Sequence, residues 1–443
     1  RPQGVLLATL YEYAHQSGVP VVKVDTTDDS RILVTGGKDG VVKIWNCAQL
    51  ESDVAVSSSH TFSAPCGSSR RRHRLRALRT VRNAKAVAVG TEAGDVFMYK
   101  IVPSRGSPTA MQVCHFAAGD QAGACAVMCI EQFDTELESL VVFAQQRGAV
   151  KGWDIRSRSP CWSDLTVPPW LGVPSCLALA SDGHALVVGT LGGGLLLYDL
   201  RFIAPWKQWR VSSGAAVLAL RSDNFRPLPG VFTALAGDCN EVALFDVTRG
   251  SCLTLFLTEP ATDRQREAAI SVPTLLEAQQ PRAGPAATPD LLGIAPDSAT
   301  GDWHSAGCVR SLWLPPRGAQ TFLLAGGTDR KVRHWSLDPE HHAAEAYIVT
   351  PHDALGSTSR SREHTTYSSN HLGDVFVVQE QLTRGGPAKS SAGSAPLAGE
   401  PEEGRPRGPN PNHRDAILDM CSISLQREIL VTASRDGLVK LWK

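Results

Sequence analysis

The last ten residues of the chain read SRDGLVKLWK, from Ser434 to Lys443, and a similar phrase, GKDGVVKIWN, runs from Gly37 to Asn46. Each stretch places Asp-Gly before apolar residues that alternate with Lys and end near a Trp. Asp-Gly favours a tight turn because both residues adopt positive φ at low cost. The alternation has the period of a β-strand. A turn-and-strand phrase that recurs at both ends of a chain indicates internal repeats.

Weaker forms of this phrase occur five more times between the two ends. The aromatic residues that mark the seven phrases are Trp45, Tyr99, Trp153, Tyr198, Phe245, Trp335 and Trp442. A short β-rich run that ends in small residues precedes each one, as in RILVTGG and KAVAVGT. Most of these runs follow another apolar run, so three strands of each unit are legible and the outer fourth is weak. The pattern predicts an all-β chain of seven four-stranded blades in a β-propeller.

Two long insertions interrupt the repeats. The first four intervals between neighbouring aromatics are 45–54 residues, whereas the last two are 90 and 107 residues. Residues 259–305 and 351–412 are rich in Pro, Gly, Ala and Ser, which predicts flexible inter-blade insertions in a single propeller that spans residues 1–443. GDVFVVQEQL, from Gly373 to Leu382, is the exception, because its strand-like apolar centre suits docking on the propeller or on a partner.

The chain ends after the third strand of its seventh unit, so the outer strand of that blade is missing. GVLLATLY, residues 4–11, precedes the first unit and has strand-like composition. We therefore predict that this N-terminal segment pairs with the strand that carries Trp442 and closes the ring. A closed ring leaves only short, protected sheet edges.

Two units share a fuller set of polar residues at matching places. These residues are His15, Thr35, Asp39 and Trp45 near the N-terminus, and His413, Thr432, Asp436 and Trp442 at the C-terminus. The pattern resembles the WD-repeat family, whose structural tetrad links Asp, His, a hydroxyl and the Trp indole by hydrogen bonds. Such a network satisfies polar groups that a blade buries. A catalytic triad is the alternative, but the same set occurs twice at equivalent positions. The sixth unit keeps Asp329 and Trp335 but has Ala325 at the hydroxyl position.

Composition excludes several classes of protein. Lys and Arg total 44 and so do Asp and Glu, which argues against a general nucleic-acid binder. Eleven cysteines include no C-x-x-C pair, which indicates scattered thiols in a reducing compartment, with no disulfide framework, metal site or cofactor. No apolar run reaches the roughly 18 residues of a membrane span, and no signal peptide is visible. The chain begins with Arg1, so we expect it to be a piece of a longer protein.

Longer phrases carry a more specific resemblance. GVLLATLYEYAHQSGV, DGVVKIWN, GAVKGWDIRS, RKVRHWSLDPE, VFVVQEQL and ILVTASRDGLVKLWK together resemble the vacuolar-protein-sorting regulatory subunits of class III phosphatidylinositol 3-kinase complexes. The resemblance covers all seven units and departs at the two insertions and at the basic run SSRRRHRLRALR. In that family, a serine/threonine-protein-kinase-like domain and a helical region precede the propeller. Neither is present here, and the chain has no glycine-rich loop before a Lys-bearing strand and no D-F-G.

The resemblance implies a non-catalytic scaffold that supports complex assembly and membrane targeting in autophagy and in endosome-to-vacuole or endosome-to-lysosome sorting. Its implied partners are the lipid kinase catalytic subunit, Beclin-type coiled-coil subunits and small GTPases. The implied location is cytoplasmic, peripheral on endosomal and autophagosomal membranes. Alternatives are a generic WD-repeat adaptor or a propeller that binds phosphoinositides or membranes, although the Phe-Arg-Arg-Gly motif of phosphoinositide-binding propellers is absent. An enzyme propeller would need convergent carboxylates or metal ligands, and the sequence identifies no such set.

A basic run lies where the first unit leads into the second. It comprises Arg70, Arg71, Arg72, Arg74 and Arg76, followed by Arg79 and Arg82. One interpretation is a solvated loop that continues into one face of a strand. The other is a patch that contacts an anionic membrane or an acidic partner, since each basic residue near an anionic surface can add ~1 kcal/mol.

Overall fold

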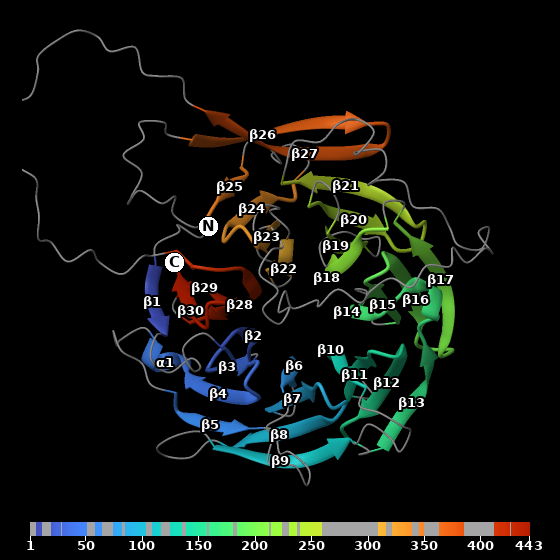
Figure 1. Ribbon diagram of the computed structural model, residues 1–443, viewed down its shortest axis with the longest axis vertical. Coiled ribbons are helices and arrows are strands. Elements are labelled where there is room, and N and C mark those ends of the chain that lie inside the picture. Colours follow the sequence, from blue (N-terminus) through green and yellow to red (C-terminus); the bar gives the residue numbers. More distant parts are fainter. Residues whose placement is uncertain are drawn as a thin grey trace, which may run out of the picture.

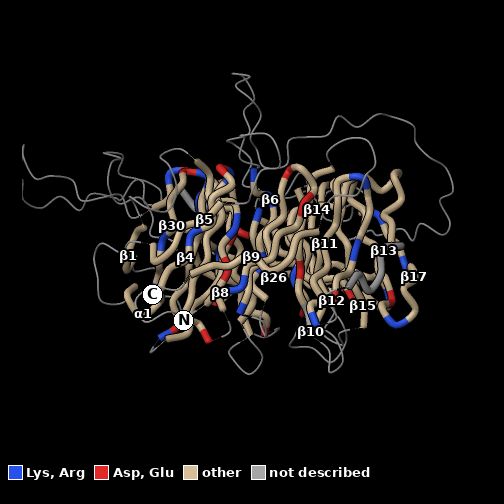
Figure 2. The backbone as a smooth tube through the Cα atoms, turned by 90° about the horizontal axis from the view of Figure 1, so that it is seen from below, with Lys and Arg blue, Asp and Glu red and all other residues tan. Residues whose placement is uncertain are grey.

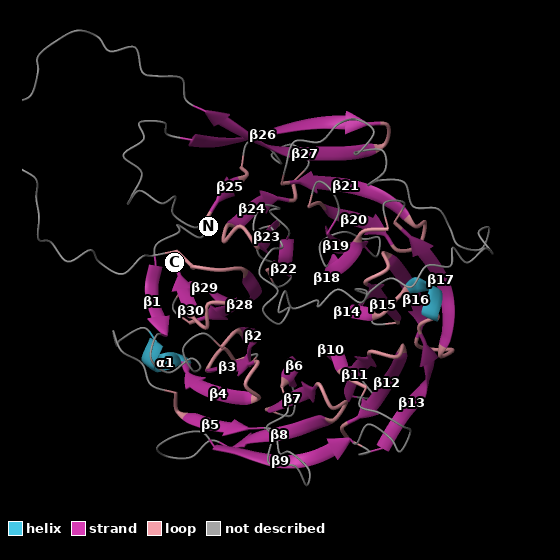
Figure 3. Ribbon diagram, viewed as in Figure 1, coloured by secondary structure: helices cyan, strands magenta, loops and turns pink. Residues whose placement is uncertain are grey.

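The fold is derived from the part of the chain that the computed structural model describes. This part comprises residues 6–10, 19–27, 29–50, 58–63, 74–81, 85–102, 109–116, 125–134, 139–156, 159–179, 184–211, 214–223, 230–236, 240–258, 309–315, 321–338, 345–349, 363–384, 412–425 and 427–443. Its strands form seven antiparallel blades around a common centre, which confirms the predicted seven-bladed propeller (Figure 1). The described helices are one turn each, α1 (Cys47–Leu50) and the 3-10 helix η1 (Pro169–Leu171) (Figure 3).

In each blade we name the strands a to d from the centre outward. Blade one consists of β2 (Val21–Thr26), β3 (Ile32–Gly37), β4 (Val41–Asn46) and β5 (His60–Ser63). Blade two consists of β6 (Leu75–Val81), β7 (Ala86–Thr91), β8 (Val96–Val102) and β9 (Thr109–Phe116). Blade three consists of β10 (Val127–Asp134), β11 (Ser139–Gln145), β12 (Ala149–Asp154) and β13 (Ser159–Thr166). Blade four consists of β14 (Pro174–Leu179), β15 (Ala185–Thr190), β16 (Gly194–Asp199) and β17 (Ala204–Arg210).

The remaining blades include the two irregular ones. Blade five consists of β18 (Ala216–Asp223), β19 (Gly230–Ala236), β20 (Val242–Asp246) and β21 (Ser251–Leu257), extended by β27 (Val375–Arg384) and β26 (Glu363–Leu372). Blade six consists of β22 (Val309–Trp313), β23 (Phe322–Gly327), β24 (Val332–Ser336) and β25 (Tyr347–Ile348). Blade seven consists of β28 (Ile417–Ser424), β29 (Glu428–Ser434), β30 (Val439–Trp442) and β1 (Leu6–Leu10). All seven marker aromatics lie on c strands, as the repeat pattern requires.

Every a strand carries a β-bulge at the same place. The pairing of the a strand with the b strand shifts by one residue after its first or second position in all seven blades. The extra residues are Val22, Arg76, Met128, Ser175, Leu218, Arg310 and Leu418, and all of them line the cavity at the centre of the ring. A bulge re-aims one side chain and increases the local twist. The bulges therefore select which side chains form the channel wall.

Small residues on the b strands explain how closely the blades approach one another. The b-strand residues opposite the bulges are Gly36, Gly90, Ala144, Gly189, Ala234, Gly326 and Ala433. A Cβ atom at Gly90 would lie 2.6 Å from Val127 Cγ1 of the next blade. A Cβ atom at Gly189 would lie 2.5 Å from Val217 Cγ1. The small residues that end each repeat run thus admit the a strand of the following blade.

The N-terminal strand closes the ring. β1 pairs antiparallel with β30, with Leu6 opposite Trp442 and Leu10 opposite Val439 (Figure 1). Leu10 is 2% exposed and belongs to a hydrophobic cluster shared by blades seven and one. The chain therefore joins its two ends in one sheet, as predicted from the unfinished last unit.

Part of the second insertion is a folded element, so the prediction of a flexible segment over residues 351–412 does not hold for Glu363–Leu372, whereas Gly373–Leu382 was the strand-like exception expected to dock. Strands β26 and β27 form a hairpin, and β27 pairs in parallel with β21 at the outer edge of blade five (Figure 1). Val377 packs in the cluster of blades four and five, whereas Val378 packs in that of blades five and six. The alternation that marked Gly373–Leu382 as strand-like therefore buries both faces of β27. Residues 259–305 lie outside the described residues.

The strand order also defines two faces of the ring. Because the strands alternate in direction, turns between b and c strands lie on one face, here called the b–c face, and turns between c and d strands lie on the other, the c–d face. Figure 2 views the ring edge-on and shows basic and acidic residues on both faces. Charge is therefore mixed over the described residues rather than separated between the faces.

Candidate functional site

The polar set of blade seven forms a continuous buried network. Trp442 Nε1 donates to Thr432 Oγ1 over 2.8 Å, and His413 Nε2 lies 2.7 Å from the same hydroxyl. His413 Nδ1 lies 3.3 Å from Asp436 Oδ2. Thr432 and His413 are at most 1% exposed. The four residues join the entry loop, the b strand, the b–c turn and the c strand of this blade.

The proton positions follow from the chemistry of the partners. Asp436 accepts from His413 Nδ1–H, which leaves Nε2 as the acceptor for the Thr432 hydroxyl proton. Burial lowers the pKa of His413 although the Asp436 carboxylate opposes this shift, so the ring is neutral at pH 7. The carboxylate also accepts from Arg414 N and, through Oδ1, from Leu438 N. The set holds a turn and a Trp in place rather than presenting a reactive group.

Blade one repeats half of this arrangement in the described residues. Trp45 Nε1 donates to Thr35 Oγ1 over 3.0 Å, and both side chains are fully buried. Asp39 Oδ1 accepts from Val41 N over 3.0 Å and holds the b–c turn. His15 lies outside the described residues. The hydroxyl-to-indole contact is thus present in both blades that carry the predicted set.

Blade six uses its turn carboxylate differently. With Ala325 at the hydroxyl position, Asp329 instead accepts from Arg333, whose Nη2 lies 2.6 Å from Asp329 Oδ2. The same guanidinium donates through Nε to Glu380 Oε2 on the inserted hairpin, also over 2.6 Å. Tyr367 Oη lies 3.4 Å from that carboxylate oxygen. This buried cluster, which sequence reasoning missed, fastens the β26–β27 hairpin to blade six.

One signal in the sequence pointed toward this cluster. Four c strands carry a cation two residues before the marker Trp, namely Lys43, Lys151, Arg333 and Lys440. Lys440 donates to Asn412 O over 2.6 Å, so in blade seven the cation ties down the entry loop. In blade six the longer Arg side chain reaches the hairpin. The position of the cation is visible in the sequence, but its partner in a distant insertion is not.

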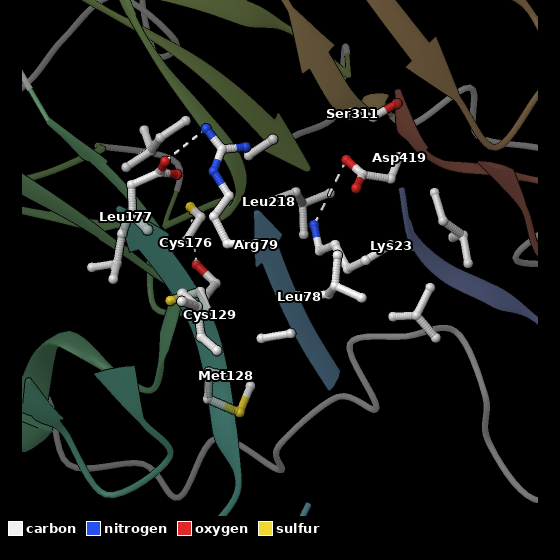
Figure 4. Close-up of a pocket in the computed structure, with 18 of the residues that line it drawn as sticks. Lys23, Leu78, Arg79, Met128, Cys129, Cys176, Leu177, Leu218, Ser311 and Asp419 are labelled. Atoms are coloured by element: carbon white, nitrogen blue, oxygen red, sulfur yellow. Dashed lines mark hydrogen bonds and ion pairs between the residues drawn. The ribbon is translucent and has the colours of Figure 1, made fainter. Parts of the chain in front are cut away.

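The centre of the ring holds a cavity of about 150 Å³ lined by all seven a strands (Figure 4). Charged side chains of neighbouring blades pair along part of its wall. Lys23 Nζ lies 3.7 Å from Asp419 Oδ1, which links blades one and seven. Arg79 Nη2 lies 2.8 Å from Glu131 Oε1, and Arg79 Nη1 lies 3.7 Å from Asp25 Oδ2, which links blades one, two and three. Burial alone would lower the pKa of Arg79, but the two carboxylates raise it above its ordinary value.

The predicted arginine patch is divided by the structure. Arg70, Arg71 and Arg72 lie outside the described residues, and Arg74 is exposed just before β6. Arg76 is the bulge residue of blade two, lines the central cavity and has Nε 3.4 Å from Glu92 Oε1. Its inclusion in a surface patch is therefore wrong. The bulge in β6 turns it toward the channel, where a carboxylate is available.

Other potential reactive groups are structural in the described part of the chain. The seven cysteines whose side chains the structure describes are free thiols, and burial raises the pKa of Cys47, Cys176 and Cys252 to about 12. Such thiols stay protonated and are poor nucleophiles at pH 7. His413, Arg414 and Asp415 spell the kinase catalytic-loop triplet, but His413 belongs to the tetrad and Met420 stands where that loop has Asn.

Among the described residues, no group of three or more His, Cys, Asp or Glu side chains is placed to hold a metal ion. The same residues contain no helix that is long and apolar enough to cross a membrane. The polar clusters described above connect strands, neighbouring blades and the inserted hairpin.

Comparison with known proteins agrees with this architecture. The family model "WD domain, G-beta repeat" matches residues 4–46 and 405–443. The chain is 27% identical over 476 aligned residues to "Serine/threonine-protein kinase VPS15" of Arabidopsis thaliana, an alignment that covers 100% of this chain and 29% of that relative. It is 24% identical over 224 residues to "Probable serine/threonine-protein kinase vps15" of Dictyostelium discoideum, covering 48% of this chain and 10% of the relative. With the Saccharomyces cerevisiae "Serine/threonine-protein kinase VPS15", identity is 22% over 58% of this chain and 17% of the relative.

The chain thus spans less than a third of the length of these relatives. It carries WD40 repeats and is homologous to the VPS15 serine/threonine-protein kinase family over its full length.

Proposed function

We propose that this chain, a WD-repeat propeller homologous to the VPS15 family, is the non-catalytic scaffold module of a regulatory subunit in a class III phosphatidylinositol 3-kinase complex. The observation that carries the proposal is an alignment across the whole propeller with a VPS15 relative of which the chain spans 29%. A propeller offers a rigid ring on which loops and outer strands bind partners. Its work is to position other subunits.

The proposed partners are the lipid kinase catalytic subunit and Beclin-type coiled-coil subunits, with small GTPases as further partners. The proposed setting is the cytoplasmic side of endosomal and autophagosomal membranes, where the complex supports autophagy and sorting to the vacuole or lysosome. Among the described residues, the outer edge of the ring differs from blade to blade, since only blade five carries two additional strands. Binding is expected to depend on a few exposed aromatic or Arg anchors.

The described polar chemistry supports a positional role. The His413–Asp436 pair holds a hydroxyl and an indole, and the channel carboxylates Asp419 and Glu131 pair with cations of neighbouring blades. These side chains contact other side chains of the ring and stabilise it. The kinase activity in the relatives' names is proposed to belong to parts of a longer protein outside these 443 residues.

The test is co-purification. The chain is co-expressed with a class III catalytic subunit and a Beclin-type subunit and captured by an affinity tag, with an unrelated seven-bladed propeller as the control. Both subunits are expected to elute with this chain and not with the control. Equal recovery from the two baits would contradict the proposal. In a parallel assay the isolated chain is expected to transfer no phosphate to lipid or protein.

A further inference from the structure

The turn between β16 and β17 of blade four and the start of β17 carry a cluster of exposed apolar side chains. Phe202 is 76% exposed, Trp206 is 54% exposed and Ile203 is 40% exposed. Nowhere else in the described chain do three exposed large apolar residues fall within five positions. β17 is the outer strand of the blade and lies on the rim of the ring (Figure 1). Because the turn that leads into it connects a c strand with a d strand, this apolar tip belongs to the c–d face. Exposed apolar clusters of this kind mark contact sites.

The tip is held in a defined conformation. Asp199 accepts from Arg201 N over 2.9 Å and from Arg201 Nη2 over 2.7 Å, which fixes the start of the turn. The Arg201 guanidinium carbon lies 5.6 Å from the centre of the Phe202 ring. Ile203 has φ of +52°, in the left-handed region that β-branched residues rarely adopt. The turn therefore keeps Phe202 and Ile203 exposed. The unfavourable φ of Ile203 costs free energy, and burial of these two side chains does not offset this cost.

Cations surround the apolar tip. Arg201 and Lys207 flank the apolar residues along the chain, and Asp199, which pairs with Arg201, is only 13% exposed against 56% for the arginine. Lys207 Nζ donates to Thr248 O over 2.7 Å and to Arg249 O over 3.2 Å, which ties the edge of blade four to the c–d turn of blade five. The Arg249 side chain is 77% exposed, whereas the nearby Asp246 is buried in its own turn. In both pairs, Arg201–Asp199 and Arg249–Asp246, the cation is the more exposed partner, so the charges that this rim presents to solvent are mainly positive.

We propose that this rim, formed by Phe202, Ile203, Trp206 and the cations Arg201, Lys207 and Arg249, docks on an anionic lipid bilayer. Phe and Ile on a projecting turn suit shallow insertion among acyl chains, and Trp favours the interfacial layer. Each cation near an anionic surface strengthens binding by about fivefold. The apolar groups project on a turn instead of lining a groove, so a fluid surface accommodates them more readily than a protein partner, which must offer a matching pocket.

The chain supplies a matched control on the opposite face. Trp170 in η1 is 61% exposed, similar to Trp206. Its neighbour Gly172 approaches the b–c turn of the same blade so closely that a Cβ atom would lie 2.7 Å from Gly192 N. β16 runs from that turn to the apolar tip, six residues or roughly 20 Å away. A bilayer held by the tip at the c–d face leaves Trp170 in water.

The test is co-sedimentation of the full chain with phosphatidylcholine vesicles prepared with and without phosphatidylserine. The double variant Phe202→Ser/Trp206→Ser is expected to lose about tenfold or more of its affinity for the anionic vesicles, while Trp170→Ser keeps the parent affinity. Arg249→Glu is expected to weaken binding only to vesicles that contain phosphatidylserine, and added salt is expected to weaken binding of the parent. All variants are expected to melt at the temperature of the parent, because the changed side chains are exposed. Affinities are compared only among variants that do so.

Two results would overturn the proposal. One is a parent chain that does not sediment with anionic vesicles. The other is a Phe202→Ser/Trp206→Ser variant that binds anionic vesicles as the parent does. If that variant also fails to co-purify with a protein subunit, the apolar tip is a protein-binding site instead. Neither result bears on the scaffold proposal itself, since capture of the kinase and coiled-coil subunits by the parent is measured separately and without lipid.

Discussion

Glu380 of the inserted hairpin lies with its Oε2 atom 2.6 Å from Arg333 Nε of blade six, and the two side chains are 3% and 2% exposed. Forty-seven positions separate them in the sequence. Asp329 completes the pairing of the guanidinium, and Lys331 Nζ lies 3.7 Å from the other oxygen of Glu380. The c-strand cation that ties down the entry loop in blade seven, Lys440, thus has a counterpart in blade six, Arg333, that holds an extra element.

Glu380→Ala is expected to lower the free energy of unfolding by about 3–5 kcal/mol, because a buried guanidinium loses one of its two carboxylates. Denaturant unfolding measures this loss, and Gln381→Ala on the exposed side of the same strand serves as the control. The double change Arg333→Leu/Glu380→Leu is expected to recover much of the loss, because both members of the fully buried pair are removed and Asp329, which loses the guanidinium, is partly exposed. Equal stability of Glu380→Ala and Gln381→Ala would show that the pair does not fasten the hairpin.

The tetrad of blade seven predicts that the nearly isosteric change Thr432→Val lowers the free energy of unfolding. Thr432→Val removes the hydroxyl that joins Trp442 Nε1 to His413 Nε2 and leaves both buried nitrogens without this partner. We expect a loss of about 1–3 kcal/mol in the free energy of unfolding. Thr233 is the matched control, since it is also fully buried but its hydroxyl finds no hydrogen-bond partner among the residues that the structure describes. Thr233→Val should be neutral or stabilising, and a similar loss in both variants would argue against the network.

The contact between blades predicts an effect of a single added methyl group. In Gly90→Ala the new Cβ would meet Val127 Cγ1 at 2.6 Å, so blades two and three must separate or Val127 must move. Overpacking of this kind costs about 1–3 kcal/mol. Blade three already carries Ala144 at this position, and Ala144→Gly should cost only about 0.5–1 kcal/mol. Thermal unfolding of the two variants measures the difference, and a Gly90→Ala variant as stable as the parent would mean that the blades are not tightly packed there.

The repeat architecture was predictable from the sequence because one pattern of turn, alternation and aromatic residue recurs and each copy folds locally. Trp45 and Trp442 lie on c strands, and the segment containing Leu10 closes the ring, as their sequence context predicts. These features depend on contacts between neighbouring repeats or between the two chain ends. They need no knowledge of distant insertions.

The remaining features depend on long-range or subtle geometry. A bulge in β6 sends Arg76 into the channel, and no residue of the basic run signals a bulge. The pairing of Glu380 with Arg333 joins an insertion to a blade, so the alternating pattern of β27 predicts a strand but not its neighbour. Exposure of Phe202 depends on a turn in which Ile203 has positive φ, which sequence propensity disfavours.

Ring closure predicts that the N-terminus stabilises the C-terminus. Deleting residues 1–11 removes β1, exposes the edge of β30 and uncovers the cluster that contains Leu10. At ~25 cal/mol per Å² of apolar surface, the loss should reach several kcal/mol, comparable to the net stability of a typical domain. Deleting only residues 1–4, which precede the strand, is the control. A shortened chain that lacks β1 but melts at the parent temperature would refute closure.

Lys440 predicts how the stability of the ring changes with pH. Its side chain is 1% exposed, and burial lowers its pKa from 10.5 to about 8 in the folded chain. Between about pH 8 and 10.5 the unfolded chain therefore binds more protons at this site than the folded chain, so stability from this group rises as pH rises through that window. Below pH 8 both states are protonated and the cost of the buried charge is constant, although its bond to Asn412 O offsets part of it. Lys440→Met should remove this dependence, so the parent should gain stability relative to the variant as pH increases from 8 to 10. Denaturant unfolding of both proteins across this range measures the change, and parallel pH profiles would show that burial does not shift the pKa of Lys440.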